Sequence, residues 1–305
     1  MLSRRELISK SPLLTLTPFA PGFLVRSLQA APGEKDHWIL VVLQLDGGND
    51  GLNTVVPIRD ENYARLRPSL RLDRSQLASI NDDLAFHPSM AAAADLLEDD
   101  RLAIIQNVGY PNPSRSHFRS MAIWQTARFD EEEPVNYGWV GRGLDHGRRS
   151  VGSDSILVGH EEIPLALRGR RSVASSMRPN ETLELISPFS PATIAATDKS
   201  SDELTSFVQR TVLDAYATAD ELVKAKVTPG HSYPATQLGE RMKLIAQLIK
   251  SGLSTRCYYA IQSGYDTHST QLPAHSRLLL EFSTAVKTFL DDLRDAGVED
   301  RVALM

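Results

Sequence analysis

The stretch WILVVLQLDGGNDGLNTVVP, residues 38–57, decides the fold. Its first part is apolar at nearly every position, which is typical of a strand buried on both faces in the centre of a parallel sheet. The turn that follows holds Asp46, Asp50 and three glycines. Ligands of open α/β sheets bind outside the carboxyl ends of the strands, so this turn is a candidate site for a hard cation. A tight turn whose carboxylates only cap the next segment is the alternative.

Strand-like and helix-like patterns alternate along the rest of the chain. This predicts an α/β fold with a doubly wound, mostly parallel sheet flanked by helices. Further strands are expected at residues 102–108, 256–261 and 302–304, and helices at 60–66, 87–97, 117–125, 201–226, 237–251 and 280–293. Short alternating runs predict a small β-rich insertion, or a cap over the sheet edge, at about residues 151–191.

The composition is that of an ordinary globular protein. The length allows about one large domain, residues 37–305. A net charge of −5 without a basic stripe makes nucleic acid an unsuitable partner. Cys257, the single cysteine, lies in a strand-like run, where a buried and inert thiol is expected.

The first 31 residues have the features of a twin-arginine export signal, a route that carries folded proteins. Arg4 and Arg5 precede an apolar run, and Ala30 and Ala31 end it. Prolines interrupt this run, which is too short to cross a bilayer comfortably, so no stable membrane insertion is expected. The sequence predicts a partnership with the twin-arginine translocase and a periplasmic or extracellular protein. An ordinary basic N-terminal arm is the alternative.

The other end of the sequence predicts a truncation. Residues 302–304 look like the start of a central strand, so the chain is expected to continue after Met305. The 305 residues alone would then leave a strand edge unpaired and are expected to be poorly soluble.

Two more segments carry side chains that could do chemistry at the same sheet edge. Ser116 and His117 precede a predicted helix, where Ser116 could attack phosphorus or sulfur, with a metal lowering its pKa. Asp266 and His268 follow a predicted strand and suit zinc, manganese or iron. Simpler interpretations are that Ser116 caps the helix and that His268 lies in a solvated loop.

Three other residues are expected to be structural. His87 precedes a proline at a predicted helix start, so a structural role is expected for it. Trp124 and Trp139 fall on apolar stripes and are expected in the core.

Six motifs occur in an order that resembles the family catalogued as domain of unknown function 1501, over about residues 41–305. They are residues 47–53, 86–88, 116–118, 138–142 and 266–271, with the twin-arginine signal before them. That family is similar to the alkaline phosphatase and sulfatase superfamily. The resemblance therefore implies an alkaline-phosphatase-like fold and a metal-assisted hydrolytic site.

By this resemblance Asp50 or Asp46 would be a metal ligand, and Asp266 and His268 would be further ligands. Ser116, with His117 beside it, would stand at the catalytic position. The implied cofactor is a divalent ion such as zinc or manganese, and the implied substrate is a small-molecule or glycan ester of phosphate or sulfate. The second Asp-His pair of the family would follow Met305, so the 305 residues alone are expected to be inactive. The alternative is a non-catalytic exported binding protein on the same scaffold.

Overall fold

The computed structural model describes residues 38–129, 136–147, 153–179 and 230–305. The predicted export signal and the predicted helix at 201–226 lie outside the described residues. The same is true of residues 180–191, the last part of the predicted insertion.

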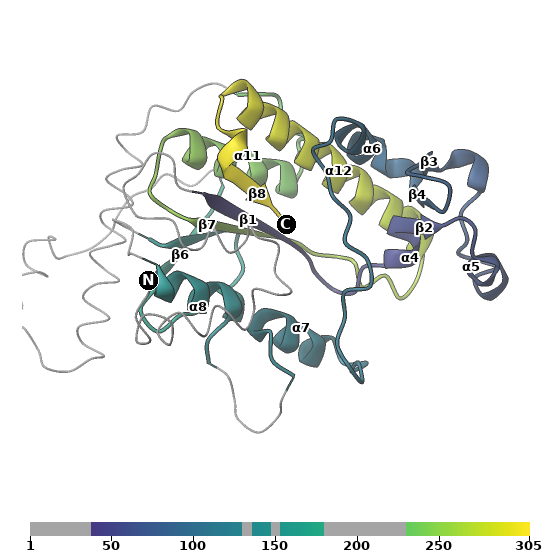
Figure 1. Ribbon diagram of the computed structural model, residues 1–305, viewed down its shortest axis with the longest axis horizontal. Helices are drawn as coiled ribbons and strands as arrows, with labels where there is room; N and C mark the ends of the chain where they lie inside the picture. The colour runs from purple at the N-terminus through teal and green to yellow at the C-terminus, as the bar shows by residue number, and fades with distance from the viewer. Residues whose placement is uncertain (1–37, 130–135, 148–152, 180–229) are drawn as a thin grey trace, which may run out of the picture.

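A five-stranded sheet forms the centre of the structure, in the order β6-β5-β7-β1-β8 (Figure 1). Its neighbouring strands are parallel. The strands are β1 (Ile39–Leu45), β5 (Ser155–Val158), β6 (Ala174–Met177), β7 (Cys257–Gln262) and β8 (Val302–Leu304). The predicted α/β class and the mostly parallel sheet are confirmed.

Strand β1, which lies between β7 and β8, is apolar without alternation because both of its faces are covered. Ile39, Val41 and Leu43 belong to the larger core cluster. Leu40 and Val42 point the other way into a second cluster. Cys257, in β7, is fully buried in that second cluster, as expected.

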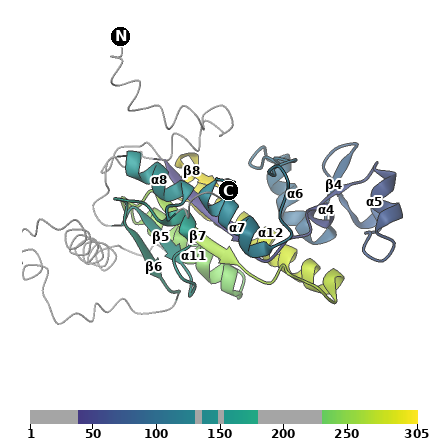
Figure 2. The same cartoon turned by 90° about the horizontal axis from the view of Figure 1, so that it is seen from below.

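Helices cover both faces of the sheet (Figures 1 and 2). The helices α11 (Gln237–Lys250) and α12 (Gln271–Asp295) supply the larger cluster. The helices α7 (His117–Thr126) and α8 (Trp139–His146) lie on the opposite face. Within the described ranges, no helix has the length and apolar character needed to cross a membrane.

A smaller unit packs beside the N-terminal part of α12 and contains an antiparallel sheet, β2-β4-β3. Its strands are β2 (Val55–Pro57), β3 (Ala78–Ser79) and β4 (Leu84–Phe86). Its α-helices are α4 (Gly51–Thr54), α5 (Glu61–Leu66) and α6 (Ala91–Glu98). Short 3₁₀ helices are η1 (Arg74–Gln76) and η2 (Pro88–Met90) here, and η3 (Leu165–Leu167) and η4 (Glu299–Arg301) elsewhere.

The strand predicted at residues 102–108 is wrong. This segment forms no strand, and Ile105 and Val108 are 67% and 74% exposed. Leu102 and Ile104 pack partly against the core. The segment is extended and apolar on one side, so its sequence pattern is similar to that of a buried strand. The sheet has no position for it beside β1, whose two edges are taken by β7 and β8.

The predicted cap over the sheet edge is also wrong for residues 153–179. Strand β5 lies inside the main sheet, between β6 and β7, and β6 forms its edge. The run at 165–167 is the 3₁₀ helix η3. Strands of four residues carry too little pattern to distinguish a main-sheet strand from an insertion.

Candidate functional site

Three segments that are far apart in the sequence meet at the carboxyl edge of the main sheet. The backbone N–H of Asp46 donates to the carbonyl of Gln262 at 2.9 Å, and the N–H of Tyr265 donates to the carbonyl of Asp46 at 3.2 Å. A Cβ on Gly47 would lie 2.7 Å from the backbone nitrogen of Asp266. A Cβ on Gly48 would lie 2.8 Å from Cε1 of His117. The turns after β1 and β7 and the start of α7 are therefore in close contact.

These segments bring three predicted site residues together in what we call the Asp266 cluster: Asp266, His268 and His117. Oδ1 of Asp266 lies 2.7 Å from Nδ1 of His268 and 3.7 Å from Nε2 of His117. The first distance is that of a hydrogen bond and the second is too long for one. All three side chains are substantially exposed, at 46%, 79% and 55% for Asp266, His268 and His117. The cluster is thus accessible to a ligand from solvent.

The position of the cluster in the topology is that of a ligand site. After β1 the chain first forms the small unit and then passes through α7 and α8, on one face of the main sheet, before it re-enters the sheet at β5. After β7 it returns at β8 by way of α12, on the other face. Such a reversal between neighbouring strands opens a crevice at their carboxyl ends, where open α/β sheets bind ligands.

Ser116 caps α7, which confirms the prediction of a capping role for this residue. Its side chain accepts from the backbone N–H of Arg119 at 3.5 Å, and its own N–H donates to Oγ of Ser114 at 3.1 Å. The Ser116 side chain is exposed, and Ser116 directly precedes His117 of the Asp266 cluster.

Asp50 is engaged by other side chains and stands outside the cluster. It caps α4 by accepting from the N–H of Asn53 at 3.3 Å. Its Oδ2 also accepts from Arg67 and from Gln271. Gln271 belongs to one of the family motifs, whereas nothing in the sequence pattern indicated Arg67. The capping interpretation of this turn is therefore confirmed for Asp50.

Asp46 is held by its own strand. Its Oδ1 accepts from Nε2 of Gln44 at 2.9 Å, and Oε1 of Gln44 accepts from the hydroxyl of Tyr259 at 2.5 Å. Burial raises the pKa of Tyr259, so this hydroxyl keeps its proton. Gln44 thus links the carboxylate of Asp46 to Tyr259 of β7.

Two histidines near the turn that follows β1 are buried. His275 lies on α12, with Nε2 2.8 Å from Oδ1 of Asn49, and burial lowers its pKa. His87 accepts from the N–H of Ser89 at 3.0 Å through Nδ1, which confirms its structural role at the start of η2. Burial lowers the pKa of His87 to about 4, and the nearby His275 contributes to the shift.

The described residues do not fit the divalent ion that the resemblance implies. The Asp266 cluster has suitable donor types, one carboxylate and two imidazoles. However, Asp50 is committed to Arg67 and Gln271, and Asp46 to Gln44. Across the ranges that the structure covers, no group of three or more His, Cys, Asp or Glu side chains is arranged to hold a metal ion.

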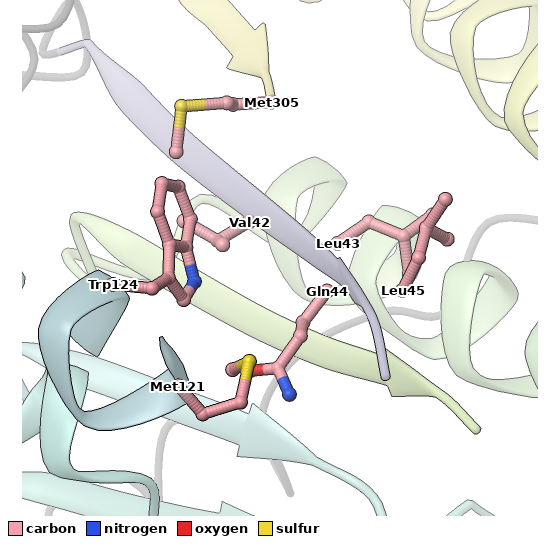
Figure 3. A pocket seen from close by; sticks show the side chains of 7 residues that line it. All are labelled: Val42, Leu43, Gln44, Leu45, Met121, Trp124 and Met305. Atoms are coloured by element: carbon pink, nitrogen blue, oxygen red, sulfur yellow. The ribbon is translucent and has the colours of Figure 1, made fainter. Parts of the chain in front are cut away.

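An apolar cavity of about 310 Å³ lies between α7 and the end of β1 (Figure 3). Its lining residues are Val42, Leu43, Gln44, Leu45, Met121, Trp124 and Met305. Trp124 stacks edge-on against Trp139 at 6.2 Å between ring centroids and is 39% exposed. Trp124 is therefore a cavity wall, and its predicted place in the core is wrong.

Comparison with known sequences supports the resemblance to this family over residues 39–305. The family described as "Protein of unknown function (DUF1501)" matches residues 39–305. No curated protein and no solved structure matches the chain. The family match spans the main sheet, the small sheet and every residue of the Asp266 cluster. The chain belongs to this family of proteins of unknown function, DUF1501.

Proposed function

We propose that this protein is an exported hydrolase of phosphate or sulfate esters, with its reacting groups in the Asp266 cluster. The observation that carries the proposal is the Asp266–His268 pair, exposed at the carboxyl edge between β1 and β7. An alkaline-phosphatase-like arrangement of the sheet and export to the periplasm or exterior are parts of the same proposal.

The proposed general base is His268, whose Nδ1 lies 2.7 Å from the carboxylate of Asp266. In the proposed reaction the carboxylate accepts from Nδ1–H of the neutral imidazole. Nε2 then has a free lone pair and can take a proton from water or from a hydroxyl nucleophile. The same imidazole, once protonated, can return the proton to the leaving group.

The start of α7 supplies the complementary positive potential. His117 is the first residue of this helix, so the N–H groups of the first turn, of which that of Arg119 is capped by Ser116, lie near the Asp266 cluster. These groups and the helix dipole favour an anion such as a phosphate or sulfate group. Ser116 is the proposed nucleophile, because its exposed hydroxyl is held only by a long contact with Arg119.

The reaction above is written without a divalent ion, because the described side chains are not arranged to hold one.

The test is hydrolysis by the purified full-length protein. Aryl phosphate and aryl sulfate esters would be assayed with and without added zinc or manganese, and bound metal would be determined by elemental analysis. His268→Ala and Asp266→Asn are expected to lower kcat/KM by roughly 10²- to 10⁴-fold, the usual contribution of a general base. His146→Ala, an exposed histidine at the end of α8, is the matched control and should keep full activity.

Two results would contradict the proposal. The enzymatic function is wrong if the wild-type protein hydrolyses none of these esters under any metal condition. The assignment of the site is wrong if both variants keep normal activity.

A second candidate is a non-catalytic exported binding protein on the same scaffold. The observation that favours it is the engagement of Asp50 by Arg67 and Gln271, which removes one predicted ligand from the site. This candidate predicts saturable binding of an ester without turnover, with affinity reduced in His268→Ala.

A further inference from the structure

A second, polar cavity of about 190 Å³ opens at the carboxyl ends of β5 and β7, beside the first turn of α11. We propose that this cavity binds a small neutral ligand rich in hydroxyl groups, of the size of one sugar ring. The inference concerns binding alone and does not depend on hydrolysis by the Asp266 cluster.

The floor of the cavity is an ion pair between a buried arginine and a glutamate whose side chain is 30% exposed. Arg241 is 5% exposed, and its Nη2 donates to Oε1 of Glu161 at 2.7 Å. Its Nη1 donates to the carbonyl of Ile261, at the end of β7. The guanidinium and the carboxylate neutralise one another, so the floor favours a neutral polar ligand over a charged one.

One atom of this floor lacks a hydrogen bond. Oε2 of Glu161 is buried and has no partner among the described residues. Leaving a buried acceptor unpaired is unfavourable, and a carboxylate oxygen needs a donor. Oε2 itself has almost no accessible surface, so a ligand hydroxyl would contact the rest of the Glu161 side chain, which is 30% exposed and lines the cavity.

The walls offer further positions for hydroxyl groups. Thr236 caps α11 by accepting from the N–H of Gly239 at 3.1 Å, so its own hydroxyl proton is available to a ligand. Oε1 of Glu281 accepts from the N–H of Leu238 at 3.3 Å, in the first turn of α11, where the helix dipole stabilises its charge. Ser263 adds an exposed hydroxyl on the turn that follows β7.

The apolar side chains in the wall and the volume of the cavity also suit a sugar ring. Leu238, Ile261 and Leu278 present carbon surface, which suits the C–H face of a sugar ring. The volume corresponds to about six water molecules at about 30 Å³ each, which accommodates one ring and excludes a disaccharide.

The experiment measures binding of single sugars to the full-length protein. Glucose, galactose, mannose and N-acetylglucosamine would be titrated by calorimetry and by saturation-transfer NMR, with inorganic phosphate and methylammonium as charged probes. We expect saturable, millimolar binding of at least one sugar. Glu161→Gln should weaken it at least fivefold, and Glu240→Gln, on the exposed side of α11, should leave it unchanged.

Ser263→Ala provides a second test if Glu161→Gln does not fold, because Ser263 is exposed and its loss should weaken sugar binding about threefold without unfolding. The proposal is overturned if no sugar binds, or if only a charged probe does. It is also overturned if sugar binding survives unchanged in every folded variant of the cavity. Because the readout is binding, it is independent of any ester hydrolysis.

Discussion

Gly47 holds the turn after β1 against the turn after β7, and its conformation is one that side chains rarely adopt, with φ of +115°. A methyl group there would lie 2.7 Å from the backbone nitrogen of Asp266, and backbone cannot move aside as a flexible side chain can. We predict that Gly47→Ala lowers the free energy of unfolding by about 1–3 kcal/mol, the range expected for a strained backbone position. Urea denaturation followed by circular dichroism measures this.

The matched control for this prediction is Gly51→Ala, at the first residue of α4. Nothing lies within 4 Å of the position that its Cβ would take. Its free energy of unfolding should stay close to that of the wild type. Equal losses in both variants would show that the contact with Asp266 does not constrain the turn.

His87 makes stability depend on pH. Its pKa is about 4 in the folded protein against about 6.5 in an unfolded chain, so the folded state binds fewer protons between these values. Stability is therefore fully present above about pH 6.5 and falls by up to about 3 kcal/mol as the pH drops towards 4. Protonation would also place a proton on Nδ1, which now accepts from Ser89.

His87→Asn keeps an acceptor for the helix start and removes this titration. Urea midpoints would be measured at several pH values between 4.5 and 7.5. The midpoint should change less with pH in this variant than in the wild type. Some change should remain, because burial also lowers the pKa of His275. His146→Asn, on an exposed histidine, should leave the slope unchanged. A wild-type midpoint that does not change over this interval would contradict the prediction.

At the scale of single residues, the sequence predicted which residues lie at the site better than it predicted the side chains that bind them. The turns of Asp46 and Asp266 could be placed on one edge because parallel strands end together. The prediction that His117 lies there depended on a strand at 102–108, which the structure does not contain. The engagement of Asp50 by Arg67 was not predictable, because a contact across an irregular loop leaves no periodic signal. The contact between Asp50 and Arg67 depends on how the small unit packs against α12.

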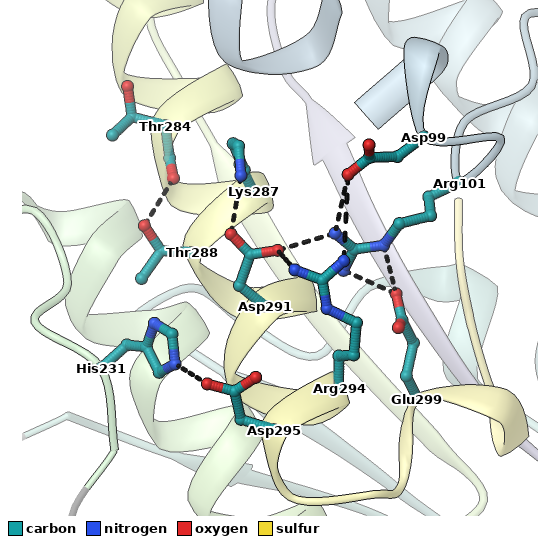
Figure 4. Close-up of polar contacts among 10 residues, drawn as sticks. All are labelled: Asp99, Arg101, His231, Thr284, Lys287, Thr288, Asp291, Arg294, Asp295 and Glu299. Carbon is teal, nitrogen blue, oxygen red and sulfur yellow. Dashed lines mark hydrogen bonds and ion pairs between the residues drawn. The ribbon is translucent and has the colours of Figure 1, made fainter. Parts of the chain in front are cut away.

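At the scale of elements, an ion-pair network attaches the C-terminal half of α12 to its neighbours (Figure 4). Arg101 follows α6, and its side chain is 12% exposed. Its Nη1 donates to Oδ1 of Asp291 at 2.7 Å, and its Nε donates to Oε1 of Glu299 at 2.8 Å. Lys287 and Arg294 also pair with Asp291, at 2.8 and 3.2 Å. The network joins α6, α12 and η4 around a single guanidinium.

We predict that Arg101→Met lowers the free energy of unfolding by about 2 kcal/mol, because two half-buried carboxylates lose their shared donor. Arg59→Met is the matched control, since the pairs of Arg59 with Asp82 and Asp83 are exposed and exposed pairs contribute little. Thermal melting and urea denaturation of both variants measure the difference. A loss for Arg59→Met as large as that for Arg101→Met would contradict this view of the network.

The elements themselves were predictable where the pattern was long. Strands β1 and β7 and the helices α11 and α12 were expected because apolar residues repeat over many positions. The segment at 102–108 was misread because its apolar residues suggested a strand, whereas sheet membership depends on an unpaired neighbouring edge. The four-residue strands β5 and β6 had too little pattern to reveal their place in the main sheet.

At the scale of the whole molecule, export can be tested without knowing the substrate. We predict that replacing Arg4 and Arg5 by lysine keeps the protein in the cytoplasm as an uncleaved precursor, because the translocase reads the arginine pair. Arg26→Lys, in the same predicted signal, is the control and should be exported. Cell fractionation with immunoblotting measures both, and normal export of the double variant would rule out the twin-arginine route.

The order of the strands in the main sheet has a consequence for the newborn chain. Strand β1 leaves the ribosome early, yet its two neighbours come from residues 257–262 and 302–304, more than 200 positions later. At 5–20 residues per second, roughly 10–40 s pass before β7 has been synthesised. During that interval a strongly apolar strand has two open edges, which invites association with other chains. We therefore expect chaperones to shield β1 until β7 and β8 have been synthesised.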